Sequence, residues 1–427
     1  MIGHQTEGWG RNSDMSSYVF TRVTRLLGAL SLLCLAFISW AQPLTKEQKD
    51  AVLKGVEDVV VNRAFVPGVD FKKWPEFIAK HQEALEKAED AAAFAGAINR
   101  ALREFGLSHI RLQTPRAAAS RNQTTAIGTG ASVTKRDEGL EVRGVNENAS
   151  AKAAGLQPGD VITKVNGQKA DDPSKLEGEK GSKVEVEVKK ANGETKTVTL
   201  ERTEYSTVRK ETLTWVDEET AVLRVFTFAA GYGRQNIETL MTEAAKAKYL
   251  VLDLRNNGGG ATNNLNHLLS LLLPDQTPYG VFVNRTTAAR FAEETKKDPN
   301  DPIAIAQWSS AQVKTRARTT VPPFSGKIAV LINRGSGSAS EIAAAALRES
   351  ASAPLVGSRT AGAVLASIFR PLPEGFAIQF PVSDFVTAKG VRLEKNPLVP
   401  DIEVTTVRND QSDPARDKAI EKLKSGG

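Results

Sequence analysis

The chain has 427 residues, which is long enough for two or three domains at roughly 100–200 residues each. Its hydrophobic fraction of 41% and charged fraction of 25% are those of an ordinary globular protein. A formal net charge of +6 on so long a chain is too small to indicate binding to nucleic acid, so we expect no nucleic-acid partner.

The N-terminus has the pattern of a secretory signal peptide over residues 1–41. Two arginines precede an uncharged apolar run at residues 26–40, and small residues surround an expected cleavage site after Ala41. We therefore expect export to the periplasm or cell envelope, with membrane attachment only if the segment is retained as an anchor. The only cysteine, Cys34, lies inside this segment, so the mature chain is predicted to contain no disulfide bond and no thiol nucleophile.

Residues 42–114 are predicted to form a small helical domain. Thr45 and Gln48 have the spacing of a capping box at a helix start. Two apolar sets then recur at helical intervals, namely Val52, Val56, Val59, Val60 and Phe94, Ile98, Leu102, Phe105. Residues 115–126 are rich in Ala, Ser, Arg and Thr without periodicity, which predicts a linker.

Residues 127–203 have the short alternating strands and turns of a β domain. Residues 154–162 read Ala-Gly-Leu-Gln-Pro-Gly-Asp-Val-Ile, and Val-Asn-Gly follows at 165–167. This core closely resembles that of a PDZ domain. The resemblance implies capture of a peptide C-terminus by strand addition, with the carboxylate held by backbone N–H groups. The cradle that it implies consists of Ile127, Gly128, Thr129 and Gly130. A PDZ fold that only orients its neighbours is the alternative.

Residues 204–410 alternate between strand and helix patterns, which predicts an α/β domain. The expected strands are 221–228, 249–254 and 327–332, and the expected helices are 236–245 and 265–273. Residues 285–320 are polar and weakly periodic, and we expect an insertion or a lid over the site there. Residues 411–427 are expected to be a C-terminal tail.

Two turns in this domain have a composition suited to chemistry. Residues 333–341 read Asn-Arg-Gly-Ser-Gly-Ser-Ala-Ser-Glu and join an apolar strand to an Ala-rich helix. A serine at such a turn exposes its hydroxyl beside a helix N-terminus that favours developing negative charge, although Ser340 could simply cap the helix. Residues 255–260 read Arg-Asn-Asn-Gly-Gly-Gly after a strand, which lets backbone N–H groups point into a cleft.

These turns, residues 355–362, the stretch 400–404 and the PDZ core together resemble the C-terminal processing peptidases, also called tail-specific proteases, and their tricorn-like relatives. The resemblance implies a multidomain α+β protein with an N-terminal helical domain, a PDZ domain and a crotonase-like α/β peptidase core of repeated ββα turns. It implies Ser338 as the nucleophile, and an oxyanion hole made by the N–H groups of Ala339 and of Gly258 or Gly259. It implies no metal and no other cofactor.

The general base of the better-known relatives is missing from this chain. Their lysine is matched by Ala363, which cannot accept a proton. Tricorn-type relatives carry a Ser-His pair before the PDZ domain, and Ser108 with His109 resembles it in sequence and position. Imidazole suits the role of base, since its ordinary pKa near ~6.5 lets it exchange protons near neutral pH. The resemblance further implies Glu394 as the acceptor that orients this pair.

The sequence therefore predicts an exported serine endopeptidase that captures protein C-termini through its PDZ domain. The expected partner is a protein or peptide with a free C-terminus. Two alternatives remain open at this point. The first is a catalytically inactive PDZ adaptor, and the second is an esterase-like acyl hydrolase on the same scaffold.

Overall fold

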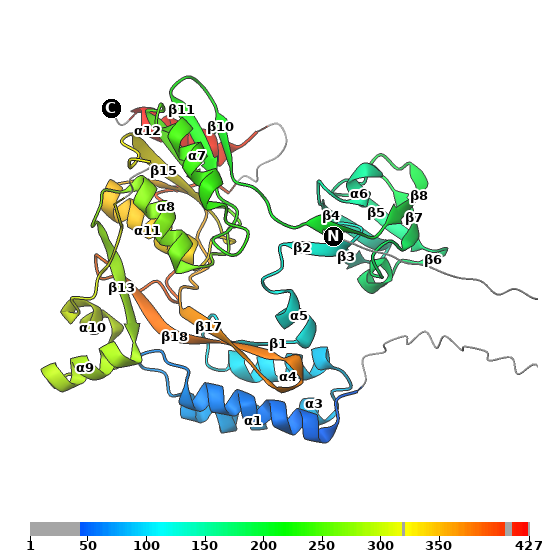
Figure 1. Cartoon of the computed structure of the whole chain (residues 1–427), viewed down its shortest axis with the longest axis horizontal. Coiled ribbons are helices and arrows are strands. Elements are labelled where there is room, and N and C mark those ends of the chain that lie inside the picture. The colour runs from blue at the N-terminus through cyan, green and yellow to red at the C-terminus, as the bar shows by residue number, and fades with distance from the viewer. Residues whose placement is uncertain (1–42, 318–320, 406–411, 426–427) are drawn as a thin grey trace, which may run out of the picture. The chain divides into compact units, whose positions relative to one another are not determined.

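The computed structural model describes residues 43–317, 321–405 and 412–425 (Figure 1). The expected signal peptide lies outside these residues. Within the described ranges, no helix combines the length and the apolar character that crossing a membrane requires.

The N-terminal helical region follows the predicted apolar pattern. Its α-helices are α1 (Lys46–Asn62), α2 (Trp74–Ala79), α3 (Gln82–Glu86) and α4 (Ala91–Arg103), with a 3₁₀ turn η1 (Phe71–Lys73) before α2. The predicted capping box is present, because Thr45 accepts from the backbone of Gln48 and the Gln48 side chain accepts from the backbone of Thr45. Both predicted apolar sets pack in one core, with only Phe105 partly exposed.

This helical region is joined to the rest of the protein by a strand. After α4, β1 (Arg111–Gln113) pairs antiparallel with β18 (Ala377–Thr387). The five-stranded sheet has the order β1-β18-β13-β14, with β17 also paired to β18. Its other strands are β13 (Pro278–Asn284), β14 (Val313–Lys314) and β17 (Ala366–Pro371). Residues far apart in the chain therefore share one core, and this packing brings residues 108–109 close to the α/β domain.

The linker prediction for residues 115–126 is corrected by a helix. Helix α5 (Pro115–Ser120) starts after Thr114, whose side chain accepts from the Ala117 N–H, and β2 (Thr125–Gly128) begins before the expected boundary. Thr followed by Pro is a helix start signal. A helix of six residues is too short to show an apolar period, so the composition alone indicated a linker.

The PDZ region is an antiparallel sheet with its own core, as predicted. The strand order is β3-β4-β5-β7-β8, with β6 paired to β5, and β2 pairs with β9 in a separate two-stranded sheet. The strands are β3 (Ala131–Arg136), β4 (Gly139–Val145), β5 (Val161–Val165), β6 (Gln168–Lys169), β7 (Lys183–Lys189), β8 (Thr195–Glu201) and β9 (Thr203–Ser206). Two short helical segments, α6 (Ser150–Ala153) and η2 (Pro173–Leu176), complete it.

The α/β domain is built on a six-stranded sheet in the order β10-β11-β12-β15-β16-β19. The first pair is antiparallel and the others are parallel. The strands are β10 (Thr212–Trp215), β11 (Thr220–Arg224), β12 (Tyr249–Asp253), β15 (Lys327–Ile332), β16 (Leu355–Gly357) and β19 (Ile402–Glu403). Parallel strands buried on both faces read as continuous apolar runs, which is why β12 and β15 were predictable.

Helices cover both faces of this sheet. Leu250 and Leu252 pack in the core that contains α7 (Arg234–Ala244), α8 (Thr262–Leu272) and α11 (Ala339–Ala351). Val251, which points to the opposite face, packs with α12 (Pro414–Ser425). The region predicted as a C-terminal tail is therefore mostly a helix that closes the second face of the sheet, because residues 415, 419 and 423 form a buried apolar stripe.

The expected lid is also corrected. Residues 285–320 contain α9 (Arg285–Thr295), α10 (Pro302–Trp308) and β14, which pack on β13 and β18 around Phe291 and Ile305. None of the described residues in this stretch lines the cavity, described below, that Ser338 and His109 share. The polar character that suggested a lid belongs to the outer faces of these helices.

Candidate active site

Ser338 lies at the junction between β15 and α11. Helix α11 begins at Ala339, and Ser338 is its N-cap residue with φ 54° and ψ −120°. Residues other than glycine rarely adopt this backbone conformation, so contacts with neighbouring residues must stabilise it. The Ser338 N–H donates to the Ala363 carbonyl at 2.9 Å and to Glu341 Oε2 at 3.2 Å. These bonds fix the backbone from which the hydroxyl projects.

The two neighbouring serines attach this loop to the glycine turn. Ser336 Oγ donates to the Leu254 carbonyl at 2.9 Å, and Ser340 Oγ donates to the Asn257 carbonyl at 2.8 Å. Both side chains are fully buried. The interpretation of Ser340 as the helix cap was wrong, because the cap is Ser338 and the Ser340 hydroxyl bonds to a different segment.

The glycine turn lies directly against Ser338. Gly259 has φ 92°, and a Cβ atom there would lie 2.6 Å from Ser338 Cβ and 2.8 Å from the Ala339 nitrogen. Only a glycine allows this approach. The Gly259 N–H donates to Asn257 Oδ1 at 3.0 Å, whereas nothing lies within 4 Å of the Cβ position of Gly258. Of the two glycines considered for the oxyanion hole, Gly258 is thus the one with open space beside it.

Ser108, His109 and Glu394 form a hydrogen-bonded chain. Ser108 Oγ lies 2.7 Å from His109 Nδ1 and donates to Glu394 Oε2 at 2.8 Å. The Ser108 N–H donates to Glu394 Oε1 at 2.8 Å, and the Val364 N–H donates to Oε2 at 2.9 Å. Glu394 is 1% exposed, so its carboxylate is buried although Lys395 follows it in the chain. His109 itself has φ 56°, a constrained conformation that directs its ring.

The electrostatic surroundings favour a neutral His109. Burial lowers the pKa of the imidazole below its ordinary value, Glu394 opposes this by favouring the charged form, and Arg111 adds to the lowering. A histidine with a lowered pKa is unprotonated at neutral pH and can accept a proton.

His109 and Ser338 line one cavity of about 830 Å³. Gly258, Gly259 and Ala339 belong to the same wall. Other lining residues are the polar Arg121, Asn122 and Gln379 and the apolar Ile342, Val364, Leu365, Ile368 and Phe369. The structure therefore brings the predicted nucleophile, base and oxyanion donors to one place. The remaining histidines of the described chain, His81 and His267, do not line it.

At the position of the missing lysine, Ala363 contacts Ser338 through its backbone and not through a side-chain amine. Ala363 contributes its carbonyl to the Ser338 N–H, and no lysine is among the described residues that line the cavity. Ser367, which also lines the cavity, accepts from Gln379 Nε2 at 2.8 Å. Gln379 on β18 thus places an amide group in the cavity from another strand, and nothing in the sequence indicated this.

Glu341 is a second residue that the sequence analysis missed. Its buried carboxylate accepts from Thr360 Oγ1 at 2.5 Å, from the Gly362 N–H at 2.8 Å and from the Ala363 N–H at 3.0 Å, besides Ser338. Burial raises its pKa, and these bonds act in the opposite direction. The Ser338-to-Glu341 spacing of a capping box could have revealed it.

The predicted peptide cradle lies at the turn between β2 and β3. Ile127 is 55% exposed, and it and Gly128 pair with β9. The Thr129 carbonyl accepts from the Ala151 N–H at 2.9 Å, and the Gly130 carbonyl accepts from the Asn146 N–H at 2.9 Å. The carbonyl groups of this turn are therefore used inside the domain.

Among the described residues, no group of three or more His, Cys, Asp or Glu side chains is arranged to hold a metal ion.

Solved structures that share the fold include the following two. The crystal structure of the tricorn protease covers 89% of this chain and is itself covered to 37%, with a TM-score of 0.52 at 15% identity. Mature CPAF complexed with lactacystin covers 89% of this chain and is covered to 98%, with a TM-score of 0.50 at 14% identity. At such low identity the likeness extends to the fold alone.

Sequence comparison identifies two domains. Residues 219–404 match Peptidase family S41, and residues 128–201 match the PDZ domain. Carboxy-terminal processing protease CtpA of Bacillus subtilis is 25% identical over 329 residues, which cover 74% of this chain and 65% of the relative. The tail-specific protease of Haemophilus influenzae is 28% identical over 322 residues, which cover 68% of this chain and 42% of the relative. A probable CtpA-like serine protease of Staphylococcus epidermidis is 24% identical over 289 residues, which cover 66% of this chain and 53% of the relative. The chain thus spans about half the length of the Staphylococcus epidermidis relative. The two domain matches and these relatives place this chain in the C-terminal processing peptidase family of PDZ-containing serine peptidases.

Proposed function

We propose that this protein is an exported serine endopeptidase that uses Ser338 as nucleophile and His109 as general base. The observation that carries the proposal is the hydrogen-bonded chain from Glu394 through Ser108 to His109, which ends in the cavity that Ser338 lines. A nucleophile beside a base that a third group orients is the general arrangement of covalent catalysis by serine.

The hydrogen-bond directions support Nε2 as the nitrogen of His109 that acts as the base. The Ser108 hydroxyl has one hydrogen and donates it to Glu394, so its oxygen accepts from His109 Nδ1–H. The lone pair is then on Nε2, which is free to take the proton of Ser338. When the imidazole becomes charged, the Glu394 carboxylate stabilises that charge through Ser108 and through space.

The reaction follows from these positions. Ser338 Oγ attacks the peptide carbonyl and gives its proton to His109, and the N–H groups of Ala339 and Gly258 stabilise the oxyanion that forms. His109 then gives the proton to the leaving amine, which breaks the peptide bond and leaves an acyl group on Ser338. Water, deprotonated by the same base, releases the acyl group and regenerates the serine.

In this proposal, the PDZ domain binds the C-terminus of the substrate and presents the polypeptide to the catalytic residues. Strand β3 ends its sheet and, within the described part of the chain, pairs only with β4, so its outer edge can accept an extended peptide by strand addition. The turn 127–130 leads directly into β3. The terminal carboxylate binds to those backbone N–H groups of Ile127, Gly128, Thr129 and Gly130 that the pairing with β9 leaves unused. The partner is accordingly an unstructured protein or peptide with a free C-terminus.

The test compares cleavage of an unfolded protein by residues 42–427 with that by Ser338→Ala and His109→Ala variants. We expect both variants to lose nearly all turnover while retaining the unfolding temperature of the parent. Binding of C-terminal peptides without any cleavage by the parent would instead favour a peptide-binding adaptor. Hydrolysis of short esters without cleavage of proteins would favour an esterase.

A further inference from the structure

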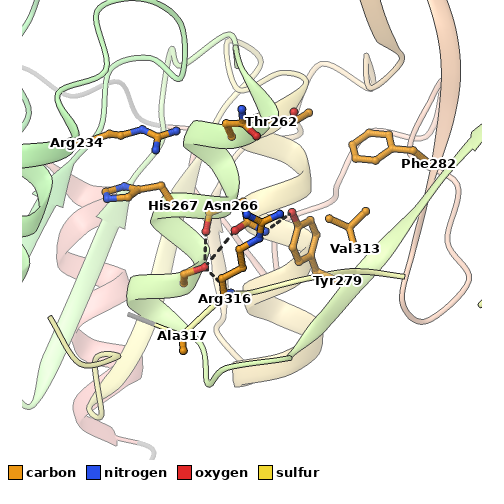
Figure 2. Close-up of a pocket in the computed structure, with 11 residues that line it drawn as sticks. Arg234, Thr262, Asn266, His267, Tyr279, Phe282, Val313, Arg316 and Ala317 are labelled. Atoms are coloured by element: carbon orange, nitrogen blue, oxygen red, sulfur yellow. Dashed lines mark hydrogen bonds between the residues drawn. The ribbon is translucent and has the colours of Figure 1, made fainter. Parts of the chain in front are cut away.

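A second cavity, of about 450 Å³, is shown in Figure 2, and it adjoins the cavity that Ser338 and His109 line. The two share Thr262, Asn263 and Phe282 in their walls. Helix α8 runs from one to the other, because its first turn lines the catalytic cavity and Asn266 and Ser270, one and two turns later, line the second. A polypeptide leaving the catalytic serine along α8 would therefore enter this second cavity, which no step of the proposed reaction uses.

The second cavity is cationic. Arg234 and Arg316 line it, and none of its lining residues is an aspartate or a glutamate. Arg234 Nε donates to Asn264 Oδ1 at 3.0 Å, which holds that side chain against the start of α8. Figure 2 shows the Arg316 side chain beside Asn266 and Tyr279. Within the described ranges, neither guanidinium group forms an ion pair, so their charge is available to a ligand.

The other ionisable groups of the wall add no compensating charge. His267 is buried, with Nδ1 at 2.8 Å from the Tyr232 hydroxyl and Nε2 at 3.1 Å from Glu238 Oε1. Burial, with a further contribution from Arg234, lowers the pKa of His267 to about 4, so this ring is neutral at neutral pH. Burial raises the pKa of the Tyr279 hydroxyl, which is neutral as well.

The polar groups between the arginines are held in place. Asn266 Nδ2 donates to the Tyr279 hydroxyl at 3.0 Å and to the Lys314 carbonyl at 2.8 Å. The Arg316 N–H donates to Ser270 Oγ at 2.9 Å, which fixes the backbone that carries this guanidinium. Guanidinium groups bind carboxylates through paired N–H donors, and a polypeptide carries such groups on Asp, Glu and its C-terminus.

The geometry of α8 gives the distance from the reacting bond. A helix rises 1.5 Å per residue, so the eight steps from Thr262 to Ser270 span about 12 Å. An extended peptide covers about 3.3 Å per residue, which places the second cavity roughly two to four residues from the scissile bond. We propose that this cavity is a substrate subsite that binds a carboxylate of the polypeptide at that separation. The inference rests on the proposed peptidase function and adds to it a preference for acidic substrates.

Binding to the Ser338→Ala protein tests the subsite without requiring turnover. The ligands are fluorescein-labelled, C-terminally amidated peptides that differ only by Glu or Gln at one position, with the position moved along the peptide. One further Gln-only pair ends in a free acid or an amide, which separates the terminal carboxylate from a side-chain carboxylate. We expect at least one acidic peptide to bind about tenfold more tightly than its neutral counterpart.

Substitution of the arginines assigns any such preference to this cavity. Arg316→Gln and Arg234→Gln, each in the Ser338→Ala background, should reduce the preference to less than threefold. The control Arg290→Gln, on the exposed face of α9, should leave it unchanged, and equal unfolding temperatures verify folding. Equal binding of every pair, no measurable binding, or a preference that survives both substitutions would overturn the subsite. If the preference is found but the parent cleaves nothing, the proposed catalysis fails and the subsite stands.

Discussion

Glu394 accepts hydrogen bonds from both the backbone N–H and the hydroxyl of Ser108, a residue 286 positions earlier in the chain. The carboxylate is buried and also accepts from the Val364 N–H beside the catalytic cavity. One side chain therefore fixes the Ser-His pair of the N-terminal region to the loop that carries the position of the missing lysine. The candidate base is positioned by a contact between distant segments.

Replacement of Glu394 by Gln should lower kcat by about tenfold to a hundredfold, because the carboxylate bonds that orient Ser108 are each worth ~1.5–3 kcal/mol. Steady-state kinetics on a peptide substrate measure the loss, and Ser108→Ala should reproduce most of it. The matched control is Glu421→Gln, at an exposed position on α12. A Glu394→Gln protein with parental kcat would show that this carboxylate does not position the base.

The pH profile of kcat/KM should have an acid limb that reports His109. Because burial lowers the pKa of this imidazole, activity should fall only as the pH drops below about 6.5, the ordinary value for histidine. Glu394 raises this pKa and Arg111 lowers it. Glu394→Gln should therefore move the limb to lower pH, and Arg111→Gln should move it to higher pH. A limb that stays in place in both variants would assign the ionisation to another group.

Gly259 should tolerate no side chain, whereas Gly258 should accept one. A Cβ at Gly259 would lie 2.6 Å from Ser338 Cβ and 2.7 Å from the Gly337 carbonyl oxygen, at a backbone φ of 92°. We expect Gly259→Ala to lose ~1–3 kcal/mol of unfolding free energy and most of the activity. Gly258→Ala keeps its N–H and meets open space, so it should retain both. Urea unfolding and peptide cleavage, measured on both variants, test this difference. Equal stability and activity of the two variants would contradict it.

Asp413 should anchor α12 to the catalytic sheet. Its carboxylate accepts from both terminal nitrogens of Arg255, at 2.8 and 2.7 Å, and Arg255 in turn bonds to Asp253 at the end of β12. Asp413→Ala should lower the free energy of unfolding by about 2–3 kcal/mol, since Arg255 keeps one of two buried partners. Urea unfolding measures this, with Asp417→Ala at an exposed site as control. Equal stability of the two variants would contradict the anchoring role.

The fold was predictable wherever apolar patterns are long or strongly periodic. The buried strand before the serine loop and the helix after it follow directly from the apolar residues 328–332 and the alanine-rich stretch that ends near Leu347. The short helix α5 and the helix α12 were missed for a different reason. Both lie in polar or low-complexity stretches. Helix α5 buries none of its residues and α12 buries three, so the apolar periodicity is too weak to outweigh the composition.

The site was predictable from motifs but not from spacing. Ser338 and Gly258–Gly259 lie at strand-to-helix turns that the sequence marks with small residues. In contrast, the contact between Ser108 and Glu394 depends on β1 pairing with β18, which no local pattern indicates. Gln379 enters the cavity by the same pairing, since it lies opposite Arg111. Long-range register decides which polar side chains meet, and a single sequence does not encode it in any short window.

The most direct measurement of the central claim is the rate at which a fluorophosphonate reagent modifies the protein, with the labelled residue identified by mass spectrometry. This reagent reacts with activated serines, so it reports the nucleophile without requiring a known substrate. We expect labelling at Ser338 alone, slowed by about a hundredfold or more in His109→Ala. Labelling of Ser338 at the same rate in His109→Ala, or labelling of a different serine, would contradict the Ser338–His109 account.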